Sequence, residues 1–409
     1  MTEGRADIFT AARAGDADAI AEFLRRDASL AKAAGPDGWN ALTHLCFSRE
    51  LSSNPDQSQS FVRAAEMLLD AGADPNSGWF EHEHAPHPVF ESVLYGAAGI
   101  AHNEALTRLL LDAGADPNEN EVVYHAPETY DNGALRALVE TGKLRADSLA
   151  TMLVRKADWH DPDGARFLLE NGADPNYATQ WQRTAFHQAI LRDNGIEMIE
   201  LMLDHGADPT RTFEGRTAAA WAALRGRGDV LAELERRSLL PAFDGVERLV
   251  AACARGDSDA ASQIARAEPA LIEDLKSRGG HLIAMFAGTG NAAGVELLIE
   301  LGIPVDAQFE GDPYFGTPPG STALHVAAWR GWPAAVEALI RRGANVNARD
   351  GAGNSPLQLA VRACVDSYWM GRRSPDSVAA LLAAGASARD VVFPCGYEPV
   401  DRLLAANRK

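Results

Sequence analysis

The pentapeptide "GADPN" decides the fold of this chain, because it recurs at Gly72–Asn76, Gly114–Asn118 and Gly172–Asn176. Four related pentapeptides begin at later glycines: "GADPT" at Gly206, "GIPVD" at Gly302, "GANVN" at Gly343 and "GASAR" at Gly385. An apolar run with helical spacing, such as "LTRLLLDA" before Gly114, precedes each of them. Glycine at the end of a helix adopts the left-handed conformation without a Cβ penalty, and the Ala, Asp and Pro that follow favour a tight turn. The repeated phrase therefore predicts a helix end and a turn at each position.

A second, shorter helix is expected ahead of several of these helices. It is clearest in "STALHVAAWRG" (Ser321–Gly331) and in "RTAFHQAILRD" (Arg183–Asp193). Each unit then consists of a turn, a helix, a second turn, a second helix and the closing glycine. Gly172 and Gly206 are 34 residues apart, a period typical of stacked helical repeats. Such repeats bury their apolar faces against their neighbours, so an isolated unit is not expected to fold.

The chain resembles the ankyrin-repeat family. The stretches "TALHVAA" (Thr322–Ala328) and "TAFHQAI" (Thr184–Ile190) are similar to the TPLHxAA signature of that family, and "GADPN" and "GANVN" are similar to its turn. The resemblance implies an all-α solenoid of about ten to eleven helix-turn-helix repeats with hairpin-like fingers. It also implies a structural role for His187 and His325, because the histidine at that position bonds locally and ties repeats together in this family.

Composition and charge narrow the class of protein. The 409 residues carry a net charge of −19, which disfavours binding to nucleic acid or to anionic membranes. The four cysteines are far apart and form no CxxC pair, so neither a disulfide framework nor a zinc module is indicated. The start of the chain lacks an apolar signal core, and no run of 18 apolar residues occurs. We expect a cytoplasmic monomer without a cofactor, and the Ala-, Gly- and Arg-rich composition suggests a bacterial source.

Two of the fingers, the segments between a turn glycine and the next helix, are longer than the others. The regular distance is 12 residues, as from Gly172 to Thr184, but Gly72 to Ser92 and Gly302 to Thr322 each take 20. Two connections between paired helices are also long. We expect a single solenoid over residues 1–409. It begins with a capping repeat at residues 1–36, followed by repeats at residues 37–238 that contain an inserted loop at 49–60 and a long finger at 77–91. Degenerate and regular repeats with a second long finger at 307–320 occupy residues 239–354, and a C-terminal repeat and cap with an inserted loop at 364–377 occupy residues 355–409.

Exposed aromatic and arginine side chains in these insertions are the candidate binding residues, because they offer large contact areas and anion recognition. The candidates are Trp39, Trp79, Phe80, Trp181, Tyr314, Phe315, Trp329, Arg330, Asp366, Tyr368, Trp369, Arg372 and Arg373. For the stretch "YWMGRRSPD" a second interpretation stays open: Tyr368 and Trp369 cover the end of the solenoid as a cap, and the arginines solvate it.

The finger 77–91 also carries candidate metal ligands. His82, His84 and His87 lie within six residues, with glutamates between them. In an extended strand His82 and His84 share a face, where imidazoles bind transition metals. The alternative is a solvated loop of mixed charge. In "HDPDGARFLL" the close acidic residues are better explained by an Asp161 N-cap followed by Pro162 at the first helical position.

These observations favour a non-enzymatic scaffold that binds a protein or peptide through its concave groove, fingers and inserted loops. No GxSxG, Walker A or HExxH motif occurs in a usable context. The alternative is a small-molecule-binding or catalytic site that the Tyr314/Phe315 finger and the Asp366–Arg373 loop enclose together. Under that alternative, Asp366, Tyr368 and Arg372 are the candidates for acid, base and anion-binding groups.

Overall fold

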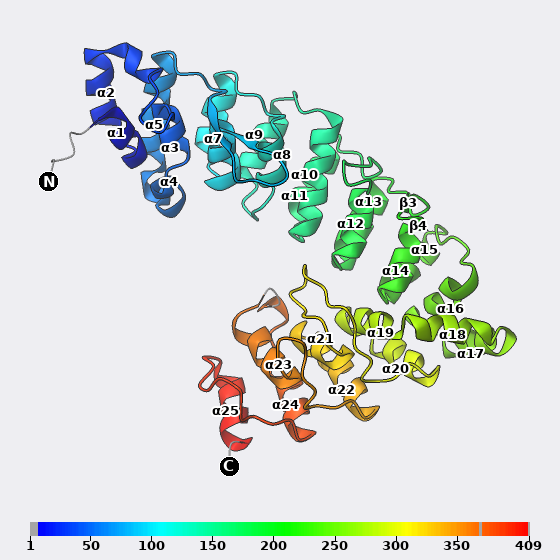
Figure 1. The fold of residues 1–409 in the computed structure, drawn as a ribbon. Coiled ribbons are helices and arrows are strands. Elements are labelled where there is room, and N and C mark those ends of the chain that lie inside the picture. Colours follow the sequence, from blue (N-terminus) through cyan, green and yellow to red (C-terminus); the bar gives the residue numbers. More distant parts are fainter. Residues whose placement is uncertain (1–6, 368–369, 408–409) are drawn as a thin grey trace. The chain divides into compact units, whose positions relative to one another are not determined.

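The computed structural model describes residues 7–367 and 370–407, which form short, mostly paired helices (Figure 1). Contacts divide the chain into two compact units, Met1–Asp208 and Pro209–Lys409. The described residues are thus mostly helical, as expected. One continuous solenoid and a total of ten to eleven repeats stay predictions.

The first unit consists of α1 (Ile8–Ala14), α2 (Ala17–Arg26), a 3-10 turn (Ala28–Ala31), α3 (Ala41–Cys46), α4 (Arg49–Ser53), a 3-10 turn (Pro55–Gln57), α5 (Ser58–Asp70), β1 (Gly78–Glu81), β2 (Val89–Ser92), α6 (Val93–Tyr95), a π-turn (Gly96–Ile100), α7 (Glu104–Asp112), α8 (Asn120–His125), α9 (Gly133–Glu140), α10 (Ala146–Asp158), α11 (Pro162–Glu170), α12 (Ala185–Leu191) and α13 (Ile196–Asp204). The first helices of successive repeats, α1, α3, α6, α8, α10 and α12, pack side by side in that order. The second helices α2, α5, α7 and α9 form a parallel row.

The second unit consists of β3 (Thr212–Phe213), β4 (Arg216–Thr217), α14 (Ala218–Leu224), α15 (Gly228–Arg236), α16 (Gly245–Ala254), α17 (Ser258–Ala267), α18 (Ala270–Ser277), α19 (Gly279–Gly288), α20 (Ala292–Glu300), α21 (Ala323–Trp329), α22 (Pro333–Arg341), α23 (Pro356–Val365), a 3-10 turn (Met370–Arg372), α24 (Asp376–Ala383) and α25 (Glu398–Asn407). Helix α21 packs between α19 and α23, and α22 packs between α20 and α24. Helix α25 packs on α24 and buries Val400 and Leu404.

The turn glycines adopt the predicted conformation. All seven have φ between 83° and 102°, in the left-handed region: Gly72, Gly114, Gly172, Gly206, Gly302, Gly343 and Gly385. At five of them an added Cβ would meet no atom within 4 Å: Gly114, Gly172, Gly206, Gly343 and Gly385. Backbone conformation, and not lack of space, therefore selects glycine at those five turns.

The asparagine that closes the "GADPN" turn joins each turn to the next one. The side-chain amide of Asn76 donates to the Gly114 carbonyl (3.1 Å), and its oxygen accepts from the Asp116 N–H (2.9 Å). Asn176 makes the same pair of bonds to Gly206 and Asp208, both at 2.8 Å. Sequence reasoning did not foresee this ladder, because it concerns groups 30 to 40 residues apart in the chain.

The signature histidines have the structural role that the resemblance implied. His187 bonds the hydroxyl of Thr184 through Nδ1 at 2.8 Å, at the start of α12. His325 is fully buried, forms a capping box with Thr322, and reaches the carbonyls of Ala348 (3.2 Å) and Asn354 (3.1 Å) in the next repeat through Nε2. One side chain thus caps its own helix and fastens the neighbouring finger.

The N-cap prediction for α11 is confirmed. Asp161 accepts a hydrogen bond from the Gly164 N–H at 3.0 Å, and Pro162 occupies the first helical position. Asp161 also pairs with Lys156, whose Nζ lies 2.7 Å from Oδ2 and whose side chain is fully buried. The acidic stretch therefore serves as a cap and as the partner of a buried cation.

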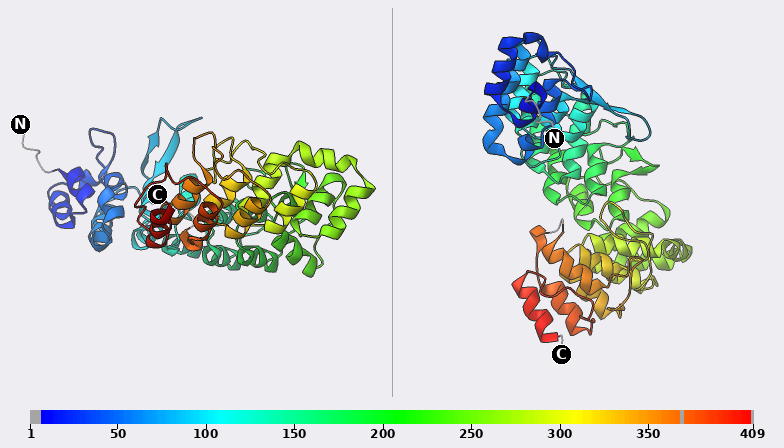
Figure 2. Two further views of the ribbon diagram at one scale, coloured as in Figure 1. Left: turned by 90° about the horizontal axis from the view of Figure 1, so that it is seen from below. Right: turned by 60° about the vertical axis from the view of Figure 1, so that its left-hand side comes forward.

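The insertions are more ordered than the word loop suggests. Finger 77–91 contains the β1–β2 hairpin, which projects beyond the helices of its own unit (Figure 2). Finger 307–320 is held by single antiparallel bridges, Gln308 with Thr322 and Asp312 with Thr317. Segment 49–60 contains α4, a 3-10 turn and the start of α5, so it is largely helical and not an open loop.

No helix within the described residues is both long enough and apolar enough to cross a membrane.

Candidate functional site

A row of aromatic rings runs through the first unit. Neighbouring ring centroids lie 4.8 to 6.1 Å apart along the whole row. We call it the aromatic stripe, and its members are Phe9, Trp39, His44, Phe47, Trp79, Tyr95, Tyr124, His125 and Trp181.

Stacking of the repeats brings these rings together. Most of them come from the first helix of a repeat or from the residue just after it, as with Phe47 after α3, Tyr95 in α6 and Tyr124 in α8. Because α1, α3, α6 and α8 pack side by side, side chains at comparable heights become neighbours. Trp39 and Trp79 join the row from two successive fingers, with ring centroids 5.1 Å apart. The stripe therefore crosses the repeats and does not follow one helix.

The rings are partly exposed and not buried as a core. All members of the stripe except His44 keep part of their surface open to solvent. Partly exposed tryptophans and tyrosines are the residues that contribute most to protein interfaces, because they combine a large apolar area with few rotatable bonds. A surface of this kind is suited to recognition.

The hairpin contributes through one of its two faces. In the β1–β2 register Trp79 lies opposite Glu91, and Phe80 lies opposite Phe90. Because side chains of a strand alternate, Trp79, Glu81 and Glu91 share one face while Phe80 points to the other. Phe80 is 55% exposed, and the centroid of its ring lies 5.2 Å from that of the Phe90 ring. Of the candidates in this hairpin, Trp79 belongs to the stripe and Phe80 does not.

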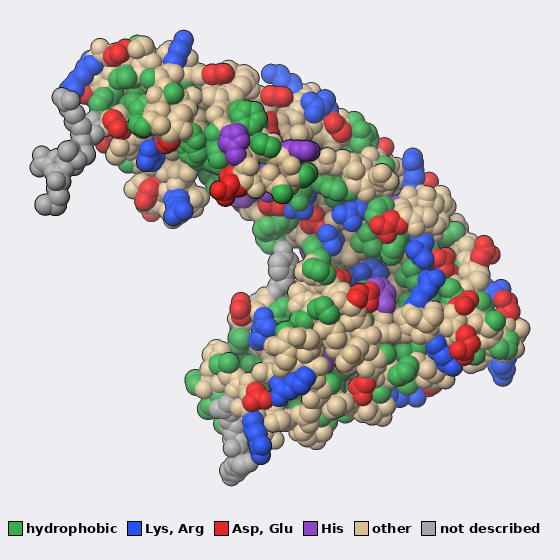
Figure 3. All heavy atoms as spheres, viewed as in Figure 1, with side chains coloured by type: hydrophobic (Ala, Val, Ile, Leu, Met, Phe, Trp, Pro, Cys, Tyr) green, Lys and Arg blue, Asp and Glu red, His purple; other side chains and the backbone are tan. Residues whose placement is uncertain are grey.

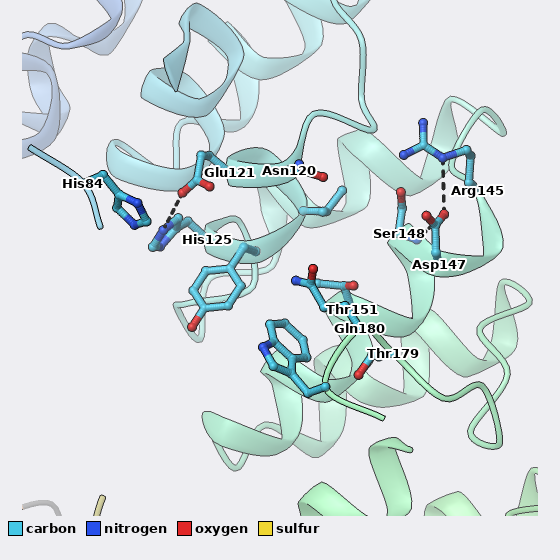
Figure 4. A pocket seen from close by; sticks show the side chains of 13 residues that line it. His84, Asn120, Glu121, His125, Arg145, Asp147, Ser148, Thr151, Thr179 and Gln180 are labelled. Atoms are coloured by element: carbon cyan, nitrogen blue, oxygen red, sulfur yellow. Dashed lines mark hydrogen bonds and ion pairs between the residues drawn. The ribbon is translucent and has the colours of Figure 1, made fainter. Parts of the chain in front are cut away.

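A pocket of about 500 Å³ lies at one end of the stripe. It is lined by His84, Asn120, Glu121, Val123, Tyr124, His125, Arg145, Asp147, Ser148, Thr151, Thr179, Gln180 and Trp181. Figure 4 shows His84, Glu121 and His125 on one side and Arg145, Asp147 and Ser148 on the other. Its wall is formed by the hairpin, α8, α10 and the finger between α11 and α12. The pocket therefore depends on several repeats at once.

A chain of charged groups underlies the pocket. His125 lies between two carboxylates, with Nε2 3.2 Å from Glu121 and Nδ1 2.8 Å from Glu128. Arg155 pairs with Glu128 and with Asp158, and its guanidinium stacks 4.1 Å from the centroid of the Tyr124 ring. These contacts hold Tyr124 and His125 in place, so the pocket floor is preorganised.

Carboxylates gather where the hairpin meets α6 and α8. Burial raises the pKa of Glu91, and so do the nearby charges of Glu81, Glu121 and Glu119, while His125 acts in the opposite direction. Burial and three of these carboxylates also raise the pKa of Tyr95 to about 12. Figure 3 shows hydrophobic and histidine side chains gathered over this part of the first unit, with acidic side chains beside them. Four carboxylates, those of Glu81, Glu91, Glu119 and Glu121, therefore lie near the middle of the stripe.

A second hollow, of about 410 Å³, lies at the other end of the stripe. Arg13, Asp37, Trp39, His44, Phe47, Ser48, Arg49 and Glu50 line it. His44 lies within 3.3 Å of Asp37 and accepts from Arg13 Nε at 3.1 Å. Burial and the charge of Arg13 lower the pKa of His44, although Asp37 acts in the opposite direction. Both ends of the stripe thus combine an aromatic wall with paired charges.

In the second unit, the finger 307–320 is fastened to the helices behind it. Phe315 is only 6% exposed, its carbonyl accepts from Trp329 Nε1 at 2.6 Å, and the Arg330 guanidinium lies 3.9 Å from its ring centroid. Arg330 is itself buried. The sequence predicts that Phe315 and Arg330 face a partner; in the structure they instead anchor the finger, because the ring and the guanidinium bury each other. Tyr314 is 39% exposed and remains accessible.

The segment 364–377 packs against its neighbours. Arg372 stacks 4.2 Å from the centroid of the Trp332 ring and donates to the Arg330 carbonyl at 3.3 Å. Arg373 lies 3.6 Å from the centroid of the Tyr397 ring. Asp366 ends α23 and is exposed, and Tyr368 and Trp369 lie outside the described residues.

The hollow that the described part of segment 364–377 lines together with α21 to α23 holds about 10 Å³, room for about one water molecule. Neither Tyr314 nor Phe315 lines it. The described residues therefore give no support to a small-molecule site enclosed by the finger and this segment.

The histidines of the hairpin are separated by its geometry. Strand β1 ends at Glu81, so His82 and His84 follow in a turn. The predicted strand face shared by His82 and His84 is therefore not present. His84 faces the pocket (Figure 4), and its Nδ1 lies 3.3 Å from the carbonyl of His87. Within the described residues, no group of three His, Cys, Asp or Glu side chains is placed to hold a metal ion.

Sequence reasoning located Trp39, Trp79 and Trp181 correctly in fingers, but it did not connect them. The other six members of the stripe were not among the candidates: Phe9, His44, Phe47, Tyr95, Tyr124 and His125. Tyr95, Tyr124 and His125 lie in repeats without the "TALH" phrase, so no motif marked them. An aromatic residue near the end of a first helix is the signal that would have pointed to them.

Comparison with known proteins identifies the repeat. Residues 152–238 match the family model "Ankyrin repeats (3 copies)", and residues 319–351 match "Ankyrin repeat". The human (Homo sapiens) protein BCL-6 corepressor-like protein 1 is 38% identical over 81 residues, which are 19% of this chain and 4% of that protein. This chain therefore spans a very small part of that relative.

Among solved structures, the human ASB11 ankyrin repeat domain is 20% identical to this chain, and the match covers 65% of this chain and 98% of that domain. The TM-score is 0.28, which is too low for an argument about fold or function.

Proposed function

Because this chain is an ankyrin-repeat protein, we propose that it is a binding scaffold that recognises a protein or peptide along the aromatic stripe of its first unit. Fold alone does not name a partner, so the argument rests on the surface. The observation that carries the proposal is the row of partly exposed rings that crosses successive repeats and ends in a pocket of about 500 Å³.

The stripe has the composition of an interface centre. Aromatic rings supply apolar contact, while amide, hydroxyl and carboxylate groups such as Gln180, Ser148 and Glu121 around the pocket offer hydrogen bonds to a peptide backbone. Several repeats contribute, so an occupant would contact a surface that exists only when they are stacked. This favours an elongated occupant over a compact one.

Substitution of Trp181 is the most informative test of the proposal. It lies in a finger turn and is partly exposed, so truncation removes contact area without opening the helical core. A displayed library of random peptides is selected on the full chain, and the affinity of the selected peptides is then measured for each variant. We expect Trp181→Ala to weaken binding about 30-fold, as for an aromatic interface residue that fills a pocket region.

Tyr130→Ala is the matched control. Tyr130 is 63% exposed, belongs to the same unit and lies outside the stripe, so its loss removes an exposed ring elsewhere. It should leave the affinity within about twofold, as expected for a residue outside the contact surface. Equal losses in both variants, or selection of peptides that bind Trp181→Ala as well as the unaltered chain, would contradict the proposal.

A further inference from the structure

We propose that the occupant of the aromatic stripe is an extended peptide segment that places a lysine or arginine side chain against Glu81 and Glu91. The inference rests on the proposed function, since it names the chemistry of the partner at the same surface. It is carried by the position of two carboxylates beside Trp79 and Tyr95 that form no ion pair within the described residues.

The dimensions of the stripe suit an extended chain. Six successive ring-to-ring steps lead from His44 to Trp181, each between 4.8 and 6.0 Å. The path is therefore at most on the order of 30 Å, which an extended peptide crosses with about ten residues. A helix would need roughly twice as many residues for the same distance and would turn most of its side chains away from the stripe.

The carboxylates of the hairpin face the stripe. Trp79 and Glu91 are opposite one another in the β1–β2 register, and Glu81 lies two residues beyond Trp79 on the same face. Glu91 is also close enough to Tyr95 for its charge to act on the phenol. The negative groups and the rings therefore occupy one surface and not two.

These carboxylates differ from their neighbours in forming no ion pair, although His125 acts electrostatically on Glu91 and the Glu83 N–H donates to Glu81 Oε1 at 2.9 Å. Glu128 and Asp158 are paired with Arg155, and Glu121 with His125. Glu119 caps α8 and accepts from Ser92 and from backbone N–H groups. In the described part of the chain no lysine, arginine or histidine lies within ion-pair distance of Glu81 or Glu91, and both side chains are partly exposed. Repulsion between these like-charged carboxylates is unfavourable, and a bound cation would reduce it.

A lysine or arginine side chain satisfies both components of the surface. Its charge compensates the two glutamates, and its stem and cationic head pack on the faces of Trp79 and Tyr95. An acidic segment would meet repulsion at the same place, and a neutral one would bury carboxylates without compensation, so both are disfavoured. Apolar residues on either side of the cation would fill the positions beside Trp39 and Trp181.

The test compares defined peptides on the full chain. A random twelve-residue library is selected on the unaltered protein, and binding of the enriched peptides is measured by fluorescence anisotropy at two salt concentrations. The variant Glu81→Gln with Glu91→Gln removes both charges and keeps the size of the side chains. Glu66→Gln, on the exposed face of α5, is the matched control because it removes a charge away from the stripe.

We expect enriched peptides to carry lysine or arginine flanked by apolar residues. Their affinity should fall about tenfold in the double variant, by the loss of charge complementarity, and should be unchanged in Glu66→Gln. Higher salt should weaken binding to the unaltered chain more than binding to the double variant.

Two results overturn the inference in distinguishable ways. If the enriched peptides lack basic residues, or if the double variant binds them as tightly as Glu66→Gln does, then the stripe recognises another chemistry. In that case binding that still depends on Trp181 leaves the proposed function in place. If no peptide is enriched over a Trp181→Ala protein, the proposed function and the inference both fail.

Discussion

The indole rings of Trp39 and Trp79 lie 5.1 Å apart, with an angle of 38° between their planes, although 40 residues separate them in the chain. Their contact joins two successive fingers, so it reports the stacking of repeats directly. The indole N–H of Trp79 is buried and has no hydrogen-bond partner within the described residues. Apolar contact, and not a polar bond, therefore holds this ring in the stripe.

We expect Trp79→Phe to lower the free energy of unfolding by no more than about 1.5 kcal/mol, because it keeps an aromatic ring and gives up an N–H group that bonds nothing. Trp79→Ala should cost about 3 kcal/mol, since it removes the whole ring from its contacts. Urea unfolding followed by circular dichroism gives both values. Equal costs for Phe and Ala would mean that the indole nitrogen has a partner after all.

The hydrogen bonds from each turn asparagine to the next turn should stabilise the folded chain, even at Asn176, whose side chain is partly exposed. Asn176→Ala removes both bonds to the next turn, at Gly206 and Asp208, and should cost about 1–2 kcal/mol. Asn171→Ala is the control, because that amide bonds only the carbonyl of Phe167 in its own helix. Its cost should stay within about 0.5 kcal/mol. A denaturant midpoint that shifts equally in both variants would show that the ladder adds no stability.

His325 should make the second unit sensitive to acid. Burial lowers the pKa of His325 below its ordinary value of 6.5, because the buried site disfavours the charged imidazolium form. Its Nδ1 accepts from the Thr322 N–H at 3.2 Å, which a proton there would prevent. The unfolded chain therefore binds the extra proton. The stabilising contribution is complete above pH 6.5 and is lost as the pH falls through this value towards the lowered pKa of the folded state.

The repeat at Ser355 supplies a matched replacement for this histidine. There Gln358 occupies the equivalent position, completes a capping box with Ser355 and donates to the Asp390 carbonyl at 2.9 Å. His325→Gln should thus fold, and its urea midpoint should change less between pH 7.5 and pH 5.5 than that of the unaltered chain. An identical pH dependence in the two proteins would place the acid sensitivity elsewhere, for example at His44 or His102, whose pKa values burial also lowers.

The buried Lys156–Asp161 pair predicts strong coupling. Asp161→Asn keeps an N-cap for α11 but leaves the ammonium group of Lys156 without its counter-charge, at a cost of about 3 kcal/mol. Adding Lys156→Met removes the stranded charge and should recover a large part of that loss. The measurement is a double-mutant cycle of unfolding free energies. Additive effects would show that the pair does not interact energetically.

Local features of the fold were predictable because they depend on residues that are close in the chain. The positive φ of Gly172 and the N-cap at Asp161 each follow from a few neighbouring residues, and the local role of His325 was implied by the family resemblance. The candidate site was predictable only in pieces. The fingers that carry Trp39, Trp79 and Trp181 could be located from the order of helices and turns in the repeat. The repeat pattern could not show which aromatic rings contact one another.

The errors have one physical origin. Phe315 and Arg330 have the residue types of a binding surface, yet they bury each other at 3.9 Å and fasten a finger. Exposure is set by what packs on a side chain from the neighbouring repeat, and a residue's type does not record that. Likewise the strand expected at His82 ends at Glu81, where the hairpin turns.

By itself, the sequence determined the unit of this protein: two helices, a glycine in the left-handed conformation and a turn, repeated along the chain. Short-range backbone preferences and apolar periodicity suffice for that, because they act within about one repeat. Only the tertiary structure decided that Trp79 contacts Trp39 and Phe47 while Phe80 points to the other face of the hairpin, and that Glu91 lies opposite Trp79 without an ion pair. The contacts of Trp79 join groups from different repeats, and they arise only when the apolar faces of the helices stack and fix the height and direction of each side chain.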